Sequence, residues 1–268
     1  MGKLITFWSP YTGKAKVTSS VCAIVGMLGL LYPELSVAIS HTHPNSIELE
    51  EKLDAPKEAG KKQEMYRKWG INLLKLYCRQ AKLTTEKIRR SAIPLCMKSL
   101  YLYPNSERHM DNLDYQLLTE TLKEEFDLVV LDLENGEGEA SQSFLDSADL
   151  IVVVLPQDPG CWNVFWKKWG IFLEGRNYLI LFGGFLETSR YSTRFYIKLI
   201  DKNTKGRMAG VIPINKAFFD AMTTGRTLDF FFRNQYVRKK EENYEFIIQT
   251  KRAAKKIKNA LFVPGFTG

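Results

Sequence analysis

The sequence predicts an α/β protein with a single doubly wound, mostly parallel sheet flanked by helices. Short apolar runs of strand length recur along the 268 residues, and helical stretches separate them. Near-continuous apolar runs such as residues 128–131 are expected when helices cover both faces of a parallel sheet. Because the chain shows no repeat, low-complexity tract or linker, we expect residues 1–268 to form one domain.

The first predicted unit is a strand, a loop, a buried helix and a second strand. Residues 4–8 are rich in β-formers, and the loop after them contains Pro10 and Gly13. Ser19 and Ser20 then open an apolar run at 21–31, and residues 36–42 have the length and composition of the next strand.

This order of elements is the layout of a phosphate-binding loop. Successive backbone N–H groups and a helix N-terminus form a positive hollow that accepts phosphate oxygens. The consensus GxxxxGK[ST] is incomplete, because Val17-Thr18 stands where Gly-Lys is required. The order of strand, loop and helix therefore indicates a phosphate site more strongly than the residues at the consensus positions do.

The remaining elements follow from the same patterns. Strands are expected at 99–103, 126–133, 150–155, 178–182 and 208–214. Helices are expected at 113–125, 141–147, 162–172, 193–201 and 216–223. Residues 47–95 are predicted to be a charged helical elaboration of the domain, with Thr84 as the N-cap of a helix within it.

Residues 241–262 are predicted to form a basic C-terminal helix. It is expected either to pack on the sheet with a solvated basic face or to contact acidic lipid or DNA phosphates. The net charge of +8 leaves the same two readings open, an anionic partner or a basic soluble surface. The basic residues of this C-terminal helix are Lys251, Arg252, Lys255, Lys256 and Lys258.

Cysteines, histidines and the apolar run exclude several classes of protein. The four cysteines form no CxxC pair and are expected to be free thiols in a reducing cytoplasm, and the three histidines lack the ligand spacing of a zinc site. The run at 21–31 is about half the roughly 20 residues of a membrane span, and it does not have the order of a signal peptide.

Four further features each have a chemical and a structural interpretation. Asp132 ends a buried strand, where it would hold Mg²⁺ together with Ser19 or would cap the next turn. His41 is a general base or a polar strand-end residue, and Lys14 and Lys16 grip phosphates or are solvated. Spacing on one helix face places a set of aromatic residues in the core or at a dimer interface, rather than on a stacking platform for nucleic acid. The set is Trp162, Phe165, Trp166 and Trp169.

With these residues in view, nearly the whole chain resembles the ParA/MinD family of deviant Walker ATPases, and within it the TadZ/CpaE-like branch. The family's GKGGVGKT is similar to residues 13–19 with one residue deleted, so that Lys14 matches the signature lysine, Ser19 the Mg²⁺-binding hydroxyl, and Thr18 replaces the phosphate-gripping lysine. The family's DxDPQ is similar to HTHPN at 41–45, where His41 replaces the catalytic Asp.

Later parts of the chain carry the same resemblance. The strand ending in Asp132 is similar to the family's strand "fDlviiD", and Gly136 stands near its switch glycine. GVIP at 210–213 resembles the turn beside the adenine, which places Pro213 on the adenine side, and residues 221–225 resemble the helix end that follows. The resemblance implies a P-loop NTPase fold with degenerate nucleotide motifs. The phosphate-binding residues that it implies are Gly13, Lys14, Lys16, Val17, Thr18, Ser19 and Ser20.

The resemblance also implies a function. The first expectation is a cytoplasmic, homodimeric positioning or assembly factor for a pilus or secretion machine, peripheral at the inner membrane face, with ATP and Mg²⁺ bound weakly or not at all and weak or absent hydrolysis. The alternatives are an active ParA-type ATPase that partitions DNA through its basic surface, and a module that uses bound ATP structurally.

Overall fold

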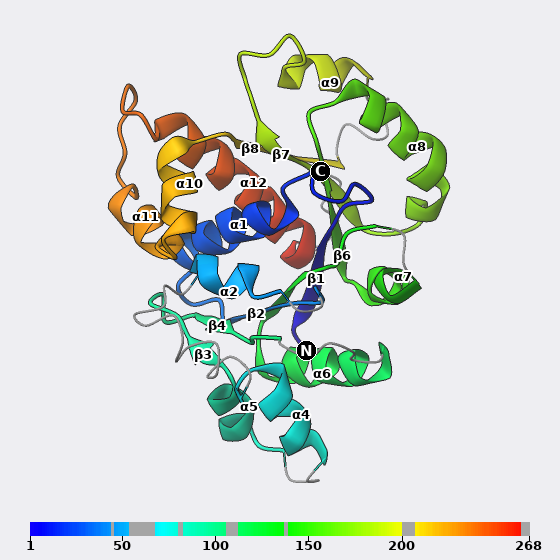
Figure 1. Ribbon diagram of the computed structural model, residues 1–268, viewed down its shortest axis with the longest axis vertical. Helices are drawn as coiled ribbons and strands as arrows, with labels where there is room; N and C mark the ends of the chain where they lie inside the picture. Colours follow the sequence, from blue (N-terminus) through cyan, green and yellow to red (C-terminus); the bar gives the residue numbers. More distant parts are fainter. Residues whose placement is uncertain are drawn as a thin grey trace.

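The computed structural model describes residues 1–43, 46–53, 68–79, 83–105, 112–136, 139–199 and 207–263. Within these residues, eight strands form one sheet in the order β3-β4-β2-β5-β1-β6-β7-β8 (Figure 1). Every neighbouring pair is parallel except β3 and β4, so the predicted fold class is confirmed. The strands are β1 (Lys3–Trp8), β2 (Val37–His41), β3 (Ile93–Pro94), β4 (Leu100–Leu102), β5 (Leu128–Asp132), β6 (Leu150–Leu155), β7 (Tyr178–Phe185) and β8 (Met208–Pro213).

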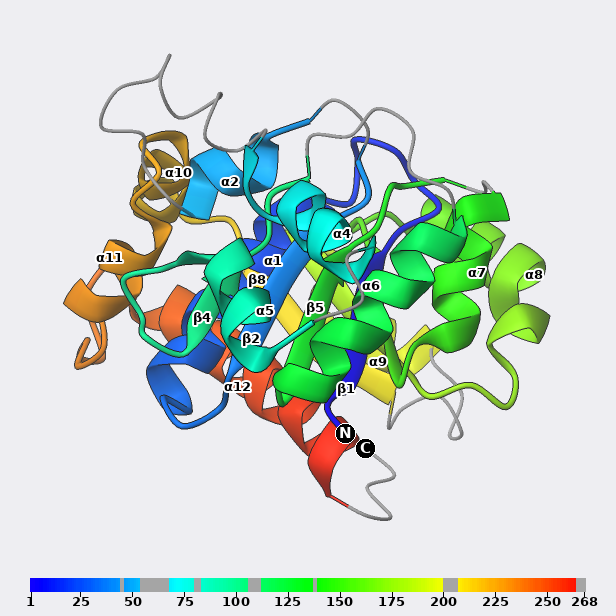
Figure 2. The same ribbon diagram turned by 90° about the horizontal axis from the view of Figure 1, so that it is seen from below.

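Helices cover both faces of the sheet (Figures 1 and 2). On one face lie α1 (Val17–Leu31), α2 (Glu48–Leu53), α10 (Lys216–Thr223), α11 (Thr227–Arg233) and α12 (Tyr244–Phe262). On the other lie α4 (Ile71–Arg79), α5 (Thr85–Ser91), α6 (Asn112–Glu125), α7 (Glu139–Ser147), α8 (Pro159–Leu173) and α9 (Thr193–Leu199).

Alternate side chains of each strand serve the two apolar layers. In β5, Leu128 and Val130 pack on the side of α1, whereas Val129 and Leu131 pack on the side of α6. This alternation explains why the central strands are apolar at most positions, since helices cover both faces of the sheet.

The parallel register brings the polar strand ends to one edge. Phe7 of β1 and His41 of β2 are both register partners of Asp132 at the end of β5. The loop after β1 therefore leaves the sheet at the same edge as His41 and Asp132. In open α/β sheets, ligands bind at this carboxyl edge.

Several elements differ from the sequence prediction at their ends. Helix α1 begins at Val17, two residues before Ser19, and α12 begins at Tyr244 rather than 241. β7 continues to Phe185, beyond the predicted end at 182. The strand β3 and the helix α11 were not predicted, because β3 has two residues including Pro94 and α11 has only seven.

The region 47–95 contains α2, α4, α5 and β3, and residues 54–67 and 80–82 of this region lie outside the described part. Pro44, Asn45 and the last two residues of the predicted helix 193–201 also lie outside it. Thr84 is the N-cap of α5, as predicted, and its side chain accepts a hydrogen bond from the Lys87 N–H at 3.3 Å. Trp162, Phe165 and Trp169 of α8 are buried, as the core interpretation predicted. None of the helices in the described ranges has the length and apolar character needed to cross a bilayer.

Helices α1 and α11 touch at Gly26. A Cβ atom on Gly26 would lie 2.3 Å from Cδ2 of Phe231, a ring that is fully buried. We expect Gly26→Ala to lower the free energy of unfolding by about 1–2 kcal/mol, because overpacking outweighs the gain in helix propensity. Urea denaturation measures the change.

Gly170→Ala is the matched control. Gly170 lies in α8, and its added Cβ would stand at an ordinary 3.4 Å from Trp166. This substitution should raise stability by about 0.5–1 kcal/mol through helix propensity. Equal stabilisation by both substitutions would contradict the close packing of α1 on α11.

Candidate functional site

The loop of residues 9–16 is held on the side of β7 by a close backbone approach. A Cβ on Gly183 of β7 would lie 2.1 Å from the Ala15 carbonyl oxygen and 2.9 Å from Oγ of Ser20. Ala15 is buried, and the aliphatic part of Lys16 passes over Gly184. Only a strand without side chains at this point allows the loop to rest on the sheet.

The beginning of α1 is open to an anion. Its N-cap, Lys16, has a left-handed backbone (φ 58°) and makes no side-chain cap, and the first turn contains no acidic residue. The Ser20 hydroxyl donates to the Lys16 carbonyl at 2.9 Å. The positive end of the helix dipole is therefore balanced by no carboxylate of its own first turn.

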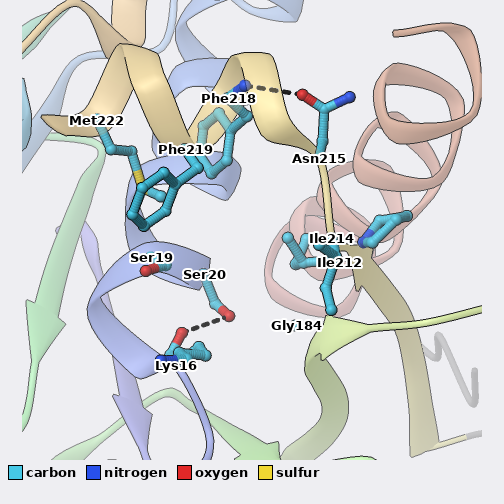
Figure 3. A pocket seen from close by; sticks show the side chains of 11 residues that line it. Lys16, Ser19, Ser20, Gly184, Ile212, Ile214, Asn215, Phe218, Phe219 and Met222 are labelled. Carbon is cyan, nitrogen blue, oxygen red and sulfur yellow. Dashed lines mark hydrogen bonds between the residues drawn. The ribbon is translucent and has the colours of Figure 1, made fainter. Parts of the chain in front are cut away.

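A pocket of about 240 Å³ lies beside this helix start (Figure 3). One wall is the beginning of α1, a second is β7 and the end of β8, and a third is α10. The lining combines a cation and hydroxyl groups on the α1 side with an apolar surface on the other. Its residues are Lys16, Ser19, Ser20, Gly184, Ile212, Pro213, Ile214, Asn215, Phe218, Phe219 and Met222.

Amide hydrogen bonds fix the wall formed by the β8–α10 turn. Asn215 caps α10 by accepting the Phe218 N–H at 2.7 Å, as Figure 3 shows. Its Nδ2 donates to Asn243 at 2.9 Å, and Asn243 donates to Asn234 at 2.9 Å. This chain of amides joins the ends of α10, α11 and α12, so the wall is tied to three helices.

The predicted phosphate-binding residues separate into two groups. Lys16, Ser19 and Ser20 line the pocket, together with Pro213 from the predicted adenine side. The others, Gly13, Lys14, Val17 and Thr18, are not among its lining residues.

Lys14 is exposed and faces α8 instead. The pKa of Asp158, at the start of α8, is lowered chiefly by the hydrogen bond from the Gly160 N–H, and the charge of Lys14 adds to this effect. In the described structure, Lys16 is thus the cation that lines the pocket.

Asp132 is a fully buried carboxylate beside His43. Oδ1 of Asp132 lies 3.3 Å from Nε2 of His43, and neither carboxylate oxygen has a hydrogen-bond donor within the described residues. Burial by itself lowers the pKa of His43, but the side-chain contact with Asp132 and the charge of that carboxylate together outweigh burial, and the pKa is raised. Asp132 does not line the pocket, although it lies close enough to α1 to contribute to the raised pKa of Cys22, which burial dominates.

The surroundings of Asp132 determine how this residue could hold a metal ion. The described residues contain no group of three metal-ligating side chains. Magnesium usually takes one or two carboxylates and completes its shell with water and phosphate oxygens. Oδ1 of Asp132 faces His43, and Oδ2 is an acceptor that such a shell would satisfy, so Asp132 fits the ion as a single ligand.

His41 belongs to a buried polar network. Its ring is 1% exposed; Nδ1 accepts the His43 N–H at 3.2 Å, and Nε2 therefore carries the proton and donates to Glu50 Oε1 at 2.9 Å. The Asn105 N–H donates to the same Glu50 oxygen at 3.2 Å. Both ring nitrogens are occupied, which supports the strand-end interpretation of His41 and gives no support to a general base.

Sequence reasoning missed several of these residues. Asn215 had a local signal, since Asn directly after a predicted strand and before a helix is a typical N-cap. Glu50 had none, because its partners His41 and Asn105 lie 9 and 55 residues away along the chain, in no local pattern, and meet Glu50 only in the fold. Gly183 could not be found either, since its role depends on where the loop rests.

Comparisons with known proteins identify the fold. No protein-family model and no curated protein matches the sequence. The septum site-determining protein MinD of Pyrococcus horikoshii, solved with Mg-ADP, superimposes with a TM-score of 0.68 at 14% identity and covers 100% of this chain and 99% of that one.

Two further structures agree with this result. The MinC:MinD cell division protein complex of Aquifex aeolicus gives a TM-score of 0.67 at 15% identity, covering 96% of each chain. A ParA family ATPase of Chlorobium tepidum gives 0.68 at 13% identity, covering 98% of each. The protein thus has the fold of MinD and ParA family ATPases.

The buried network around Glu50 can be tested by stability. Glu50→Ala leaves the His41 Nε2–H and the Asn105 N–H without their acceptor, and each unsatisfied buried group costs about 1–3 kcal/mol. Glu50→Gln keeps an acceptor at Oε1, so we expect a clearly smaller loss. Chemical denaturation of both variants at neutral pH gives the comparison, and equal losses would show that the charge of Glu50 matters rather than its hydrogen bonds.

Proposed function

We propose that this protein binds a nucleotide in the pocket between α1 and the β8–α10 turn, hydrolyses it weakly or not at all, and serves as a MinD/ParA-like positioning or assembly factor. The observation that carries the proposal is the pocket itself. It places a helix start, Lys16 and two serine hydroxyls opposite an apolar wall. Anionic phosphates suit the first side, and a flat base suits the second.

The base is proposed to lie against the β8–α10 wall. Pro213, Ile212 and the ring of Phe219, which is 63% exposed, offer apolar contact there. The volume of about 240 Å³ is below the range of about 300–1,000 Å³ that is typical of ligand pockets. It accommodates a base and ribose, and the phosphates would extend along the start of α1.

Phosphate affinity is expected to be modest. Thr18 stands where the related family has a phosphate-gripping lysine, and one charge-assisted hydrogen bond contributes about 1.5–3 kcal/mol. Its loss would weaken binding by roughly ten- to a hundredfold. Lys16, at the mouth of the pocket, offsets part of that loss.

Hydrolysis is expected to be weaker still. A carboxylate that orients the attacking water acts on the transition state, so its absence lowers turnover more than binding. At the corresponding place, His41 is buried and donates to Glu50. Mg²⁺, where bound, would be held by Ser19 and Asp132 and would neutralise phosphate charge.

The proposed cellular role is based on the similarity of this chain to other proteins. Solved structures with this fold include MinD and a ParA family ATPase. The sequence resemblance to the TadZ/CpaE-like branch supports a homodimeric factor that recruits a pilus or secretion machine at the inner face of the membrane. Exposed apolar side chains at the carboxyl edge of the sheet, Leu186, Ile214 and Phe219, are compatible with a second copy covering this edge.

Calorimetric titration with ATP–Mg²⁺, followed by a phosphate assay on the same sample, tests the proposal. We expect binding without turnover at the rates of active ATPases. Lys16→Ala should weaken binding about tenfold, since it removes a charge beside the phosphates. The control Lys167→Ala changes an exposed lysine on α8, outside the pocket, and should leave affinity unchanged. Absence of any heat or thermal shift with nucleotide would refute the proposal.

A second candidate, a DNA-partitioning ATPase, is favoured by α12. Five cations follow Gln249 on this helix, and no ion pair in the described structure involves them. Its apolar residues Phe246, Ile247 and Ile257 are buried in the core. The helix therefore offers charge to a partner, whereas lipid insertion would need the apolar face that packing already uses.

Binding to a random-sequence DNA duplex distinguishes this candidate. If α12 contacts phosphates, affinity should fall steeply between about 50 and 200 mM salt, and Arg252→Glu with Lys255→Glu should abolish it. Lys167→Glu with Lys98→Glu changes the net charge equally at exposed sites away from α12. Undetectable binding at low salt would remove the partition candidate and leave the first proposal intact.

A further inference from the structure

Three asparagines at helix ends form a continuous chain of hydrogen bonds beside the pocket. Asn215 is the N-cap of α10, Asn234 is the C-cap of α11, and Asn243 is the N-cap of α12. An N-cap side chain usually accepts an N–H of its own helix, but Asn243 makes no such bond. Its amide is bonded instead to the two other asparagines, at 2.9 Å each. We call this chain of side chains the asparagine relay.

The asparagine relay has one direction, because a backbone group ends it on each side. At one end the Phe218 N–H, which can only donate, bonds Oδ1 of Asn215 at 2.7 Å. At the other end the Phe230 carbonyl, which can only accept, bonds Nδ2 of Asn234 at 2.8 Å. Each amide must therefore accept from the α10 side and donate toward α11. Turning over the Asn243 amide would set two donors face to face on one side and two acceptors on the other.

The first member of the relay is part of the pocket wall. Asn215 lines the pocket, and so do Phe218 and Phe219 of the helix that it caps. Figure 3 shows the amide nitrogen of Asn215 pointing away from the start of α1, and this nitrogen donates to Asn243. Neither Asn243 nor Asn234 is among the lining residues. Their effect on a ligand in the pocket therefore passes through Asn215.

We infer that Asn243 is a positioning residue for the proposed nucleotide site, and that the relay couples this site to the connection between α11 and α12. The inference rests on the proposed function, because the ligand is the nucleotide that we place in the same pocket. Without the Asn243 oxygen, Asn215 is held only by its bond to the Phe218 N–H, and the wall loses its tie to α12. Coupling free energy is reciprocal, so a nucleotide that holds Asn215 in place also stabilises the bonds of Asn243 and Asn234.

The affinity for ADP–Mg²⁺, measured by calorimetry on the whole chain, is the direct test. We expect Asn243→Ala to weaken binding about three- to tenfold, the effect of one neutral hydrogen bond. Asn243→Asp keeps an acceptor for the Asn215 amide, so it should recover part of this loss. Asn177→Ala is the matched control, because the Asn177 amide donates to the Asp149 carbonyl at 3.0 Å, just before β7 and away from the pocket. It should leave the affinity unchanged.

The outcomes separate the inference from the proposed function. If the unchanged protein binds ADP and Asn243→Ala binds it equally well, the inference is overturned and the proposed function stands. A loss of the same size in Asn177→Ala, or no recovery in Asn243→Asp, would also overturn the positioning role. Binding of ADP to none of the proteins would overturn both.

Hydrogen exchange in the unchanged protein tests the coupling without any substitution. The N–H groups of Val237 and Tyr244 make hydrogen bonds within the connection between α11 and α12, at 3.2 and 3.1 Å. We expect ADP–Mg²⁺ to slow exchange at both. The Glu174 N–H, bonded at 3.1 Å at the end of α8, should exchange at the same rate with and without the nucleotide. Slowing confined to the pocket lining would contradict the inference even where Asn243→Ala fails to fold.

Discussion

The close contact between Gly183 and the loop determines the shape of the candidate site. The Ala15 carbonyl occupies the space that a β-carbon of residue 183 would fill, so the loop rests on β7 and does not stand free above α1. Lys16 must then turn through a left-handed conformation to enter the helix, which leaves α1 without a side-chain cap. The pocket opens between this uncapped helix start and the end of β8. Its position follows from one backbone contact.

On either side of this contact, the carboxyl edge of the sheet has an open side next to β8 and a closed side next to β5 and β2. Toward β8 the pocket offers a cation, hydroxyl groups and apolar surface. Toward β5 and β2, several polar groups are paired with one another: His41 with Glu50, and Gly136 with Trp8 and Ser9. The pocket offers binding contacts on the first side, whereas His41 on the second side is already paired with Glu50. The same division explains why we propose binding with little turnover.

Local patterns were enough to predict the sheet but not the closed side. Apolar runs such as 128–131 and 150–155 were recognisable because burial on both faces leaves no polar positions within them. The cap at Thr84 was recognisable because it acts within one turn. Glu50 pairs with residues that only tertiary folding brings near, and the loop of residues 9–16 is shaped by a glycine over 160 positions away. Sequence motifs placed Ser19 and Pro213 at one pocket, but they also suggested Gly13 and Lys14, which do not line it.

A nucleotide bound in this pocket would also stabilise the folded protein. A ligand that binds only the folded state stabilises it by about 2.7 kcal/mol when its concentration is a hundred times its dissociation constant. The pocket joins α1, β8 and α10, and the amides of Asn215, Asn243 and Asn234 extend this junction to α11 and α12. Occupancy would therefore stiffen the same helices that carry the basic surface of α12.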